Sequence, residues 1–266
     1  MESNELSEQL NQLGQLVVAV LKSPKYRNVC EDLIRSIGMQ ELSKRRNLKT
    51  AIKFTKNRLH QIGGSYFLAK PNYGLWLERL REAKGSEDKD LFRKICAEIM
   101  SHHYSTRERL NILDEFYTRI FSLLPRIRSV MDVGCGFNPL SIPWMPLSSE
   151  TKYYAYDVYK DMISFLNDFM IIANIQGFAE TRDVIQSPPH DSTDLALILN
   201  TMPCFEQIDR SAGLKVLESI NAIFLVVSYP LQTLGGREKG MREHYEARFH
   251  ELTRNKDWII QRLEFR

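Results

Sequence analysis

The sequence lacks the features that mark most secreted, membrane and metal-binding proteins. Its 266 residues include only four cysteines, Cys30, Cys96, Cys135 and Cys204, with no C-x-x-C pair, so neither a zinc site nor a disulfide framework is expected. No run of about 18 apolar residues occurs, which argues against a membrane span. The N-terminus is acidic and polar, unlike a signal peptide, so we expect a cytoplasmic protein.

A strong net charge is also missing, but the basic residues are concentrated in one place. Lysine plus arginine number 36 and aspartate plus glutamate 33, which gives +3. The segment 44–58 has no acidic residue and carries +7, so the rest of the chain sums to −4 by subtraction. Its basic residues are Lys44, Arg45, Arg46, Lys49, Lys53, Lys56 and Arg58. A focal basic segment predicts a surface that binds a polyanion; the alternative is a solvated helix face.

Strand-forming residues are scarce in the first part of the chain. From residue 6 to residue 119 apolar residues recur at three- and four-residue steps, which predicts a bundle of short helices. Ser23-Pro24 matches a helix start, and residues 85–88 match a turn and cap before a helix over 91–100. Ser105 and Glu108 match the S-x-x-E capping box, which predicts another helix start before residues 110–120.

After Pro125 the pattern changes to strands that alternate with helices. Short apolar runs predict strands over 130–133, 152–156, 178–181, 194–199 and 222–228, and helical windows cover 162–175 and 211–220. This alternation predicts a doubly wound α/β fold with a parallel sheet covered on both faces. Residues 258–265 match one more strand, and because the chain stops where a final antiparallel strand is expected, we expect a truncated C-terminus.

The strongest local motif follows the first predicted strand. Residues 132–139 read Asp-Val-Gly-Cys-Gly-Phe-Asn-Pro, and Gly134 and Gly136 allow a tight turn that a ligand can approach closely. Asp157 ends the next strand, 157 − 136 = 21 positions after Gly136, where a carboxylate can accept hydrogen bonds from both ribose hydroxyls. Asp183 ends the third strand and fits a partner for an adenine amino group, and Val184 can flank the ring.

A third glycine, which dinucleotide sites use for helix packing, is missing. Ser141 stands near its position, and Pro139 and Pro143 interrupt the helix start that would bind a pyrophosphate. The D-x-G-x-G form is typical of S-adenosylmethionine (AdoMet) sites, which bind no pyrophosphate, so we expect AdoMet as the cofactor. Arg109 can clamp the methionine carboxylate bidentately. No metal is expected at the adjacent pair His102 and His103, which lacks other ligands nearby.

Several stretches together resemble one family, the aminoglycoside-resistance 16S ribosomal RNA (guanine-N7) methyltransferases of the Arm/Rmt group. They are residues 58–66 (RLHQIGGSY), 103–109 (HYSTRER), 132–140, 228–230 (SYP) and 235–241 (GGREKGM), followed by Tyr245. Many methyltransferases share D-x-G-x-G, whereas H-x-S-T-x-E-R and G-x-x-K-G-M are much more specific to this family. Relatives often have lysine where this chain has Asn200, so no target-pocket role is carried over to that position.

The resemblance implies a class I, Rossmann-like methyltransferase domain over 106–266 and an all-helical domain over 1–105 that docks on the ribosome. It implies methylation of N7 of guanine 1405 in the 16S rRNA of the assembled 30S subunit, which confers aminoglycoside resistance. We expect a monomer with no membrane partner, whose RNA-binding surface is the basic segment 44–58. The implied cofactor-binding residues are Tyr66, His103, Ser105, Arg109, Gly134, Cys135, Gly136, Asp157, Asp183, Val184, Leu199 and Gln207.

The chemistry of guanine N7 determines what the target site must do. N7 carries a lone pair and no proton, so no residue is expected to act as an acid or base, and in-line proximity supplies most of the acceleration. Because N7 lies in the deep, narrow major groove of A-form RNA, the base must be exposed or flipped. The residues expected to position it are Tyr229, Arg237, Lys239 and Met241. Two alternatives stay open: a non-catalytic RNA- or ribosome-binding protein, and an adenine-N1 methyltransferase of the neighbouring site.

Overall fold

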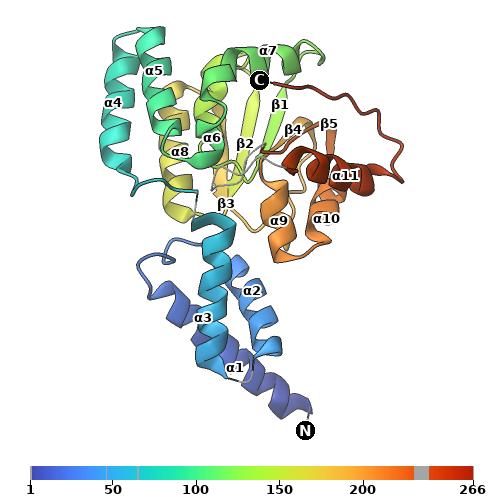
Figure 1. Cartoon of the computed structure of the whole chain (residues 1–266). Coiled ribbons are helices and arrows are strands. Elements are labelled where there is room, and N and C mark those ends of the chain that lie inside the picture. Colours follow the sequence, from blue (N-terminus) through green and yellow to red (C-terminus); the bar gives the residue numbers. More distant parts are fainter. Residues whose placement is uncertain (1, 46, 65, 231–239, 266) are drawn as a thin grey trace.

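The computed structural model describes residues 2–45, 47–64, 66–230 and 240–265. Figure 1 shows a narrow unit of three helices at the N-terminal end and a larger unit in which helices surround a sheet. All five strands of the described chain lie in the larger unit, as the scarcity of strand signals before Pro125 predicts. None of the helices in these ranges is long and apolar enough to cross a membrane.

A parallel sheet forms the centre of the larger unit. Its strands are β1 (Ser129–Val133), β2 (Lys152–Asp157), β3 (Gln176–Thr181), β4 (Thr193–Leu199) and β5 (Ala222–Ser228). All pairings are parallel, in the order β3-β2-β1-β4-β5. The order reverses between β1 and β4, and ligands of open α/β sheets bind at the carboxyl ends of the strands at such a reversal. The doubly wound α/β fold predicted from the sequence is confirmed.

Helices cover both faces of the sheet, which explains the continuous apolar runs of its central strands. Val130, Leu195 and Leu197 pack with α4 (Tyr73–Gly85), α5 (Lys89–Met100), α7 (Leu113–Phe121) and α8 (Lys160–Ala173). Their strand neighbours point to the other face, because side chains alternate along a strand. Met131 and Ile198 there meet α9 (Met202–Ile208) and α10 (Ala212–Ser219).

The helical N-terminal unit is shorter than the sequence suggests. It consists of α1 (Glu2–Leu21), α2 (Glu31–Lys44) and α3 (Leu48–Leu59), whose core includes Leu16, Ile34 and Ala51. Helices α4 and α5 instead belong to the sheet unit (Figure 1), and they bury Trp76 and Phe92 in its core. The predicted boundary at residue 105 therefore differs from the packing. An amphipathic pattern shows that a helix has a buried face but does not show which surface covers it.

Several local predictions also differ from the structure. Ser23-Pro24 lies in a turn after α1, and α2 begins at Glu31; the fixed φ of proline suits a turn as well as a helix start. Ser105 lies inside the short helix α6 (Tyr104–Arg107) and does not cap a helix. The cap before α5 is confirmed, because Asp88 accepts hydrogen bonds from two backbone N–H groups of its first turn.

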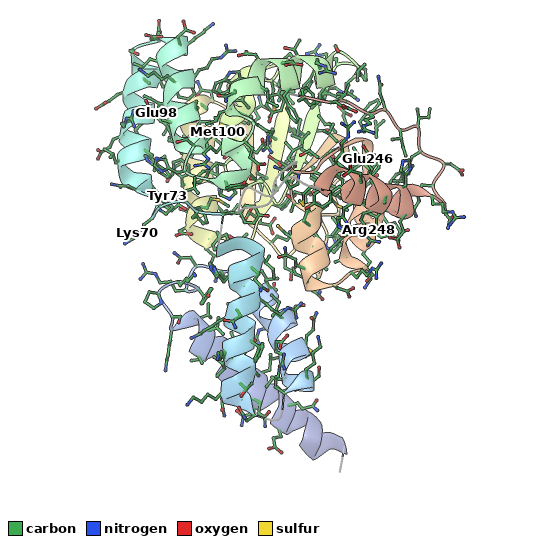
Figure 2. The ribbon with its side chains drawn as sticks, in the orientation of Figure 1. Lys70, Tyr73, Glu98, Met100, Glu246 and Arg248 are labelled. Carbon is green, nitrogen blue, oxygen red and sulfur yellow. The ribbon has the colours of Figure 1, made fainter. Side chains whose placement is uncertain are left out.

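The C-terminal region contains a helix that the sequence pattern does not indicate, α11 (Met241–Thr253). Arg248, which is labelled in Figure 2, fastens it to α9 and the turn that follows: its guanidinium donates to Glu206 Oε1 on α9 at 2.6 Å and to the Arg210 carbonyl at 2.7 Å. The strand predicted over 258–265 is wrong, since residues 256–265 have no regular secondary structure. They run along the surface until the Phe265 ring packs on Phe116, with centroids 5.0 Å apart, so side-chain contacts hold this end in place of a strand ladder.

Arg58 joins the N-terminal unit to the sheet unit. Its guanidinium donates to the carbonyl of Ile208 at 2.6 Å and to that of Gln207 at 3.2 Å, both on α9. It also donates to Gln40 at 2.7 Å and pairs with the buried Glu41 at 3.3 Å on α2. One arginine therefore bridges three helices. This assignment corrects the prediction that Arg58 belongs to the RNA-binding surface, because its donors are used inside the protein.

We predict that Arg58→Met lowers the free energy of unfolding by about 2–3 kcal/mol, because two α9 carbonyls lose their donor and Glu41 keeps only Arg45 as a charged partner. Lys53→Met on the same helix is the matched control, since the Lys53 side chain is exposed. Denaturant unfolding of both variants measures the difference. Equal stability of the two variants would contradict the bridging role.

Candidate functional site

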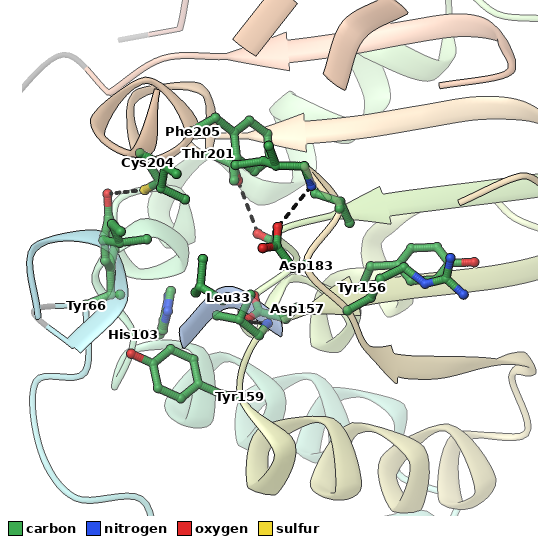
Figure 3. A pocket seen from close by; sticks show the side chains of 18 residues that line it. Leu33, Tyr66, His103, Tyr156, Asp157, Tyr159, Asp183, Thr201, Cys204 and Phe205 are labelled. Carbon is green, nitrogen blue, oxygen red and sulfur yellow. Dashed lines mark hydrogen bonds between the residues drawn. The ribbon is translucent and has the colours of Figure 1, made fainter. Parts of the chain in front are cut away.

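A cleft opens at the carboxyl ends of β1, β2 and β4 (Figure 3). The empty space between its walls is about 680 Å³, open solvent included. The sheet unit contributes Gly134, Asp157, Asp183 and Thr201. The N-terminal unit and the segment after it contribute Leu33 and Tyr66. The cleft is thus completed by segments far apart in the sequence.

Two glycines form the turn that follows β1. Gly134 has φ +64° and Gly136 has φ +51°, a left-handed conformation that other L-residues adopt at a cost. A Cβ on Gly134 would lie 2.3 Å from Thr201 Cγ2, and one on Gly136 would lie 2.8 Å from the His103 ring. Both conformation and space therefore require glycine, which leaves the backbone of this turn open to a ligand.

Asp157 holds that turn against β2. Its carboxylate accepts hydrogen bonds from the backbone N–H of Gly136 at 3.0 Å and from that of Val158 at 2.7 Å. Burial raises the pKa of Asp157, and these N–H donors oppose the rise. Each carboxylate oxygen has a second lone pair, so Asp157 can hold the turn and still accept hydrogen bonds from a ligand's hydroxyls.

Asp183 presents an unused acceptor to the cleft. Its side chain is 3% exposed, and Oδ1 accepts from the Ile185 backbone N–H at 3.1 Å (Figure 3). Oδ2 is buried and has no hydrogen-bond partner. Burial raises the pKa of this carboxyl, and the backbone donors beside it lower it. A buried acceptor without a partner is costly, so this position fits a ligand that brings an N–H or O–H donor.

His103 lies between the glycine turn and Tyr66. Its ring is 5.7 Å from the Tyr66 ring in a stacked arrangement, and Ser105 Oγ lies 3.1 Å from its Nδ1. Burial, with the nearby Arg109 charge, lowers the pKa of His103 to about 3, so the ring is neutral at physiological pH. Among the described residues, no three His, Cys, Asp or Glu side chains gather as a metal ion would require.

Arg109 is a buried cation without an acidic partner. Its side chain is 5% exposed, and only Nη2 has a partner, Asn138 Oδ1 at 3.2 Å. Nε and Nη1 are buried and make no hydrogen bond. No ion pair of the described chain includes Arg109 within 4 Å. Because burying an uncompensated charge is expensive, this arrangement fits an anionic group of a ligand.

Asn138 connects Arg109 to a second buried charge. Its Oδ1 also accepts from Tyr117 OH at 2.8 Å, and its Nδ2 donates to Asp132 Oδ2 at 2.9 Å. Tyr153 OH donates to the same Asp132 oxygen at 2.6 Å. Burial raises the pKa of Asp132 to about 7, although Tyr153 and Asn138 lower it by donating hydrogen bonds. These residues are called the Asn138 network below: Arg109, Tyr117, Asp132, Asn138 and Tyr153.

The cleft brings together half of the residues predicted to bind the cofactor. Tyr66, His103, Gly134, Asp157, Asp183 and Val184 line it. Ser105, Arg109, Cys135 and Gly136 lie behind this lining, and Ser105 and Gly136 contact it through His103 and Asp157. Their role in binding stays a prediction.

Leu199 and Gln207 do not fit their predicted role. Leu199 is buried in the core on one face of the sheet, and Gln207 is exposed on α9 with its carbonyl bonded to Arg58. Neither residue lines the cleft. A motif match assigns a role to a position in the sequence. It does not show which way that side chain faces, because this depends on where each strand and helix ends in the folded protein.

The lining includes residues that the sequence reasoning missed. Thr201 and Cys204 follow β4, and the rule that ligands bind beyond the carboxyl ends of strands could have indicated them. Cys204 Sγ shares a hydrogen bond of 3.1 Å with Tyr66 OH (Figure 3). Leu33 of α2 and Ile62 close the cleft from the N-terminal unit. No local signal marks these two, since they are ordinary apolar residues of a helical pattern.

The region after β5 contains only part of the predicted target site. The Tyr229 ring stacks on Tyr245 of α11 at 4.8 Å, and burial raises the pKa of Tyr229. Met241 begins α11, whereas Arg237 and Lys239 lie outside the described residues. Two aromatic rings therefore meet near the carboxyl ends of β4 and β5.

Asn200, at the position where the resemblance would place a lysine, has a structural role of its own. It adopts φ +60°, which asparagine tolerates better than most residues. Its Nδ2 donates to Glu108 Oε2 at 2.9 Å, and its Oδ1 accepts from Ser228 Oγ at 3.0 Å. Asn200 therefore links the ends of β4 and β5 to the segment that carries Arg109.

The side chains of the basic segment 44–58 fall into two groups, those exposed on the surface and those that contact other parts of the protein. Lys44, Lys49 and Lys53 are exposed. Lys56 is half-buried and donates to Ser23 at 2.9 Å, and the Arg45 guanidinium lies 3.8 Å from the Phe54 ring. Arg46 lies outside the described residues. The exposed lysines form a smaller surface than the seven predicted residues.

Comparisons with known proteins agree with this geometry. A family model described as "Ribosomal RNA methyltransferase (FmrO)" matches residues 22–266. The chain is 34% identical over 256 residues to a 16S rRNA (guanine(1405)-N(7))-methyltransferase of Micromonospora echinospora, covering 96% of this chain and 93% of that one. A Serratia marcescens protein of the same description is 30% identical, covering 89% and 88%. The crystal structure of 16S rRNA methyltransferase RmtF with S-adenosyl-L-homocysteine has TM-score 0.76 and 28% identity, covering 91% and 89%.

The raised pKa of Asp132 predicts a pH-dependent stability. Its pKa is about 7 in the folded protein, against an ordinary value of 3.8, so the folded state binds the proton more tightly. Its contribution to the free energy of unfolding therefore falls as pH rises from about 4 to about 7. We predict that Asp132→Asn removes this dependence, which amounts to a few kcal/mol at most, on the order of 1.4 per pKa unit.

Denaturant unfolding of wild type and variant from about pH 5 to about pH 8 measures this difference. The exposed Asp257→Asn is the control and should follow the wild type. The same pH dependence in wild type and Asp132→Asn would show that Asp132 is not the titrating group.

Proposed function

Because this chain belongs to the ribosomal RNA methyltransferase (FmrO) family, we propose that it transfers a methyl group from AdoMet to N7 of guanine 1405 in 16S rRNA. The RNA substrate is the assembled 30S subunit, and the product confers resistance to aminoglycosides such as gentamicin and kanamycin. The relatives named above carry this activity in their descriptions. The proposal places the protein in the cytoplasm, where it acts as a monomer on the subunit.

One observation carries the cofactor assignment: two buried groups of opposite charge have unused hydrogen-bonding atoms at this end of the sheet. Arg109 has free donors at Nε and Nη1, and Asp183 has a free acceptor at Oδ2. AdoMet carries a carboxylate at one end and the adenine amino group at the other, so it supplies the missing partner of each. The glycine turn and Asp157 lie in the same cleft and fit the sugar between them.

Bound AdoMet supplies an electrophilic methyl group on a sulfonium sulfur. The residues of the chain would bind and orient it: Arg109 the carboxylate, Asp157 the ribose hydroxyls and Asp183 the adenine amino group. Tyr66 and His103 form a stacked wall beside the glycine turn. This wall restricts water and fixes the direction from which a target base can approach, and such positioning can supply most of the acceleration.

The titratable groups of the cleft support transfer to an atom that needs no deprotonation. Burial lowers the pKa of His103 to about 3, which makes it a poor base at neutral pH. Burial raises the pKa of Tyr66 well above its ordinary value and that of Cys204 to about 11, so both stay protonated. Guanine N7 offers a lone pair without a proton, so none of these three residues is needed as a base.

The N-terminal unit supplies a surface for the RNA backbone. Lys49, Lys53 and Lys56 recur at four- and three-residue steps along α3, which places them on one face of the helix. The buried residues Ala51 and Thr55 lie on the other face. Exposed lysines in such a row bind phosphates without reading sequence. We therefore assign docking on the subunit to this face and the transfer to the cleft.

Methylation mapping tests the proposed function. Purified protein, AdoMet and 30S subunits should give borohydride–aniline cleavage at guanine 1405, which reports N7 methylation. Asp183→Asn should reduce AdoMet affinity about tenfold or more, because the loss of one hydrogen bond to a charged group costs about 1.5–3 kcal/mol. The exposed Asp257→Asn is the control with the same chemical change.

The other outcomes identify the alternatives. Reverse transcription blocked at a neighbouring adenine, without cleavage at the guanine, would support the adenine-N1 activity. Folded protein that does not bind AdoMet in calorimetry would support a non-catalytic ribosome-binding role. Unchanged susceptibility to gentamicin and kanamycin on expression would contradict the proposed consequence.

A charge reversal on α3 tests the docking role separately. We predict that Lys49→Glu with Lys53→Glu weakens 30S binding at least tenfold and flattens its salt dependence, because phosphate contacts release counterions. AdoMet affinity should not change, since neither lysine lines the cleft. Lys89→Glu with Lys94→Glu on α5 alters charge equally at exposed positions and serves as the control. Equal binding by both double variants would rule out α3 as the docking face.

A further inference from the structure

The Asn138 network lies behind the cleft and contains the only contact that fixes the Arg109 guanidinium by hydrogen bonding among the described residues. We infer that Asn138 is a positioning residue: its amide, oriented by Asp132, aims Arg109 at a ligand carboxylate while leaving the positive charge unneutralised. The inference rests on the proposed function, because it concerns how the methionine carboxylate of AdoMet is recognised.

Hydrogen-bond complementarity sets the orientation of the Asn138 amide. Its NH₂ group donates to Asp132 Oδ2 at 2.9 Å, and a carboxylate oxygen there can only accept when ionised. The carbonyl oxygen must then face the other side, where Arg109 donates at 3.2 Å and Tyr117 at 2.8 Å. If the Asn138 amide were flipped, its NH₂ group would face the N–H groups of Arg109, and two donors cannot form a hydrogen bond with each other. Asp132 therefore determines which Asn138 atom meets the guanidinium.

Hydrogen bonds on both sides of its amide restrict the movement of Asn138. Tyr153 occupies the same Asp132 oxygen at 2.6 Å, and Tyr117 OH is also bonded to Ser141 Oγ at 2.7 Å. The Asn138 backbone belongs to the glycine turn, since its N–H donates to the Cys135 carbonyl at 2.9 Å. Arg109 is thereby held at a fixed place relative to the turn that faces the ligand, across 29 positions of sequence.

The partner of Arg109 is neutral, and this matters for binding. An acid in direct contact would satisfy the guanidinium and compete with a ligand carboxylate. Asp132 interacts with Arg109 electrostatically, but Asn138 stands between them. Glu108, the preceding residue, is bonded to Asn200 at 2.9 Å. Nε and Nη1 carry three of the five guanidinium N–H donors. These three donors make no hydrogen bond among the described residues, so they can bind the carboxylate of a ligand.

Two ligands that differ in the methionine part test the inference. S-adenosylhomocysteine carries the carboxylate, and 5′-methylthioadenosine has the same nucleoside and sulfur without it. We expect Asn138→Ala to weaken S-adenosylhomocysteine binding about tenfold, of the order of one organised charged hydrogen bond. Binding of 5′-methylthioadenosine should change less than about twofold. Isothermal calorimetry at a constant pH of about 8.5, above the pKa of Asp132 so that this carboxylate is ionised, measures both affinities.

Asn167→Ala is the matched control, because it removes an equally connected asparagine far from Arg109. Asn167 Nδ2 donates to the Ala179 carbonyl at 2.8 Å, and its Oδ1 accepts from the Ala179 N–H at 2.8 Å. This variant should lose thermal stability but keep the wild-type ratio of the two affinities. The ratio therefore separates positioning from a general loss of structure, which would weaken both ligands alike.

Asp132→Asn provides a second variant if Asn138→Ala does not fold. An amide at position 132 can present either its oxygen or its NH₂ group to Asn138, so the orientation of Asn138 is no longer fixed. The ratio of the S-adenosylhomocysteine affinity to the 5′-methylthioadenosine affinity should therefore fall, as expected for Asn138→Ala. Equal weakening of both ligands, or no weakening of either, in the folded variants would overturn the inference. Wild-type protein that binds neither ligand would contradict the proposed function and the inference with it.

Discussion

A buried arginine without an acidic partner is the constraint on which the site depends. Arg109 is 5% exposed, and among the described residues its only hydrogen-bond partner is the neutral Asn138, so the protein buries a charge without a direct ion pair at a place where a ligand can supply one. The surrounding polar groups are consistent with this: Asp132 is held one residue away, its pKa raised by burial. Asp183 is similar: its Oδ2 is a buried acceptor without a hydrogen-bond partner among the described residues. Stability at these positions is lower than it would be with internal ion pairs, and binding specificity is the gain.

The sheet explains why these groups meet. The strand order reverses between β1 and β4, so the segments after β1, β2 and β4 converge on one edge. The glycine turn after β1 then lies beside Thr201 after β4, close enough that any Cβ on Gly134 would overlap it. The N-terminal unit closes the cleft with Leu33 and is fastened to α9 by Arg58. The surface proposed for docking and the cleft proposed for transfer therefore lie on connected units.

The sequence predicts the sheet well because its central strands are buried on both faces and read as continuous apolar runs. The positions of Gly134, Gly136, Asp157 and Asp183 were also predictable, since each lies at the carboxyl end of a strand or within three residues beyond it. The packing of α4 and α5 was not, because an amphipathic helix does not name its partner surface. The same holds for Arg58. A basic segment in the sequence shows that charge is present but not which way each side chain points, and the Arg58 side chain points into the protein. Leu199 and Gln207 do not line the cleft, and their predicted role in cofactor binding stays a prediction.

The central claim is that Arg109 and Asp183 hold the two ends of one ligand. A crystal structure of the chain with S-adenosylhomocysteine is the most direct measurement. It should place the ligand carboxylate on Arg109 Nε or Nη1, with Asn138 still bonded to Nη2, and the adenine amino group on Asp183 Oδ2. A ligand bound elsewhere, or bound in the cleft with its carboxylate in solvent and Arg109 unpaired, would contradict it.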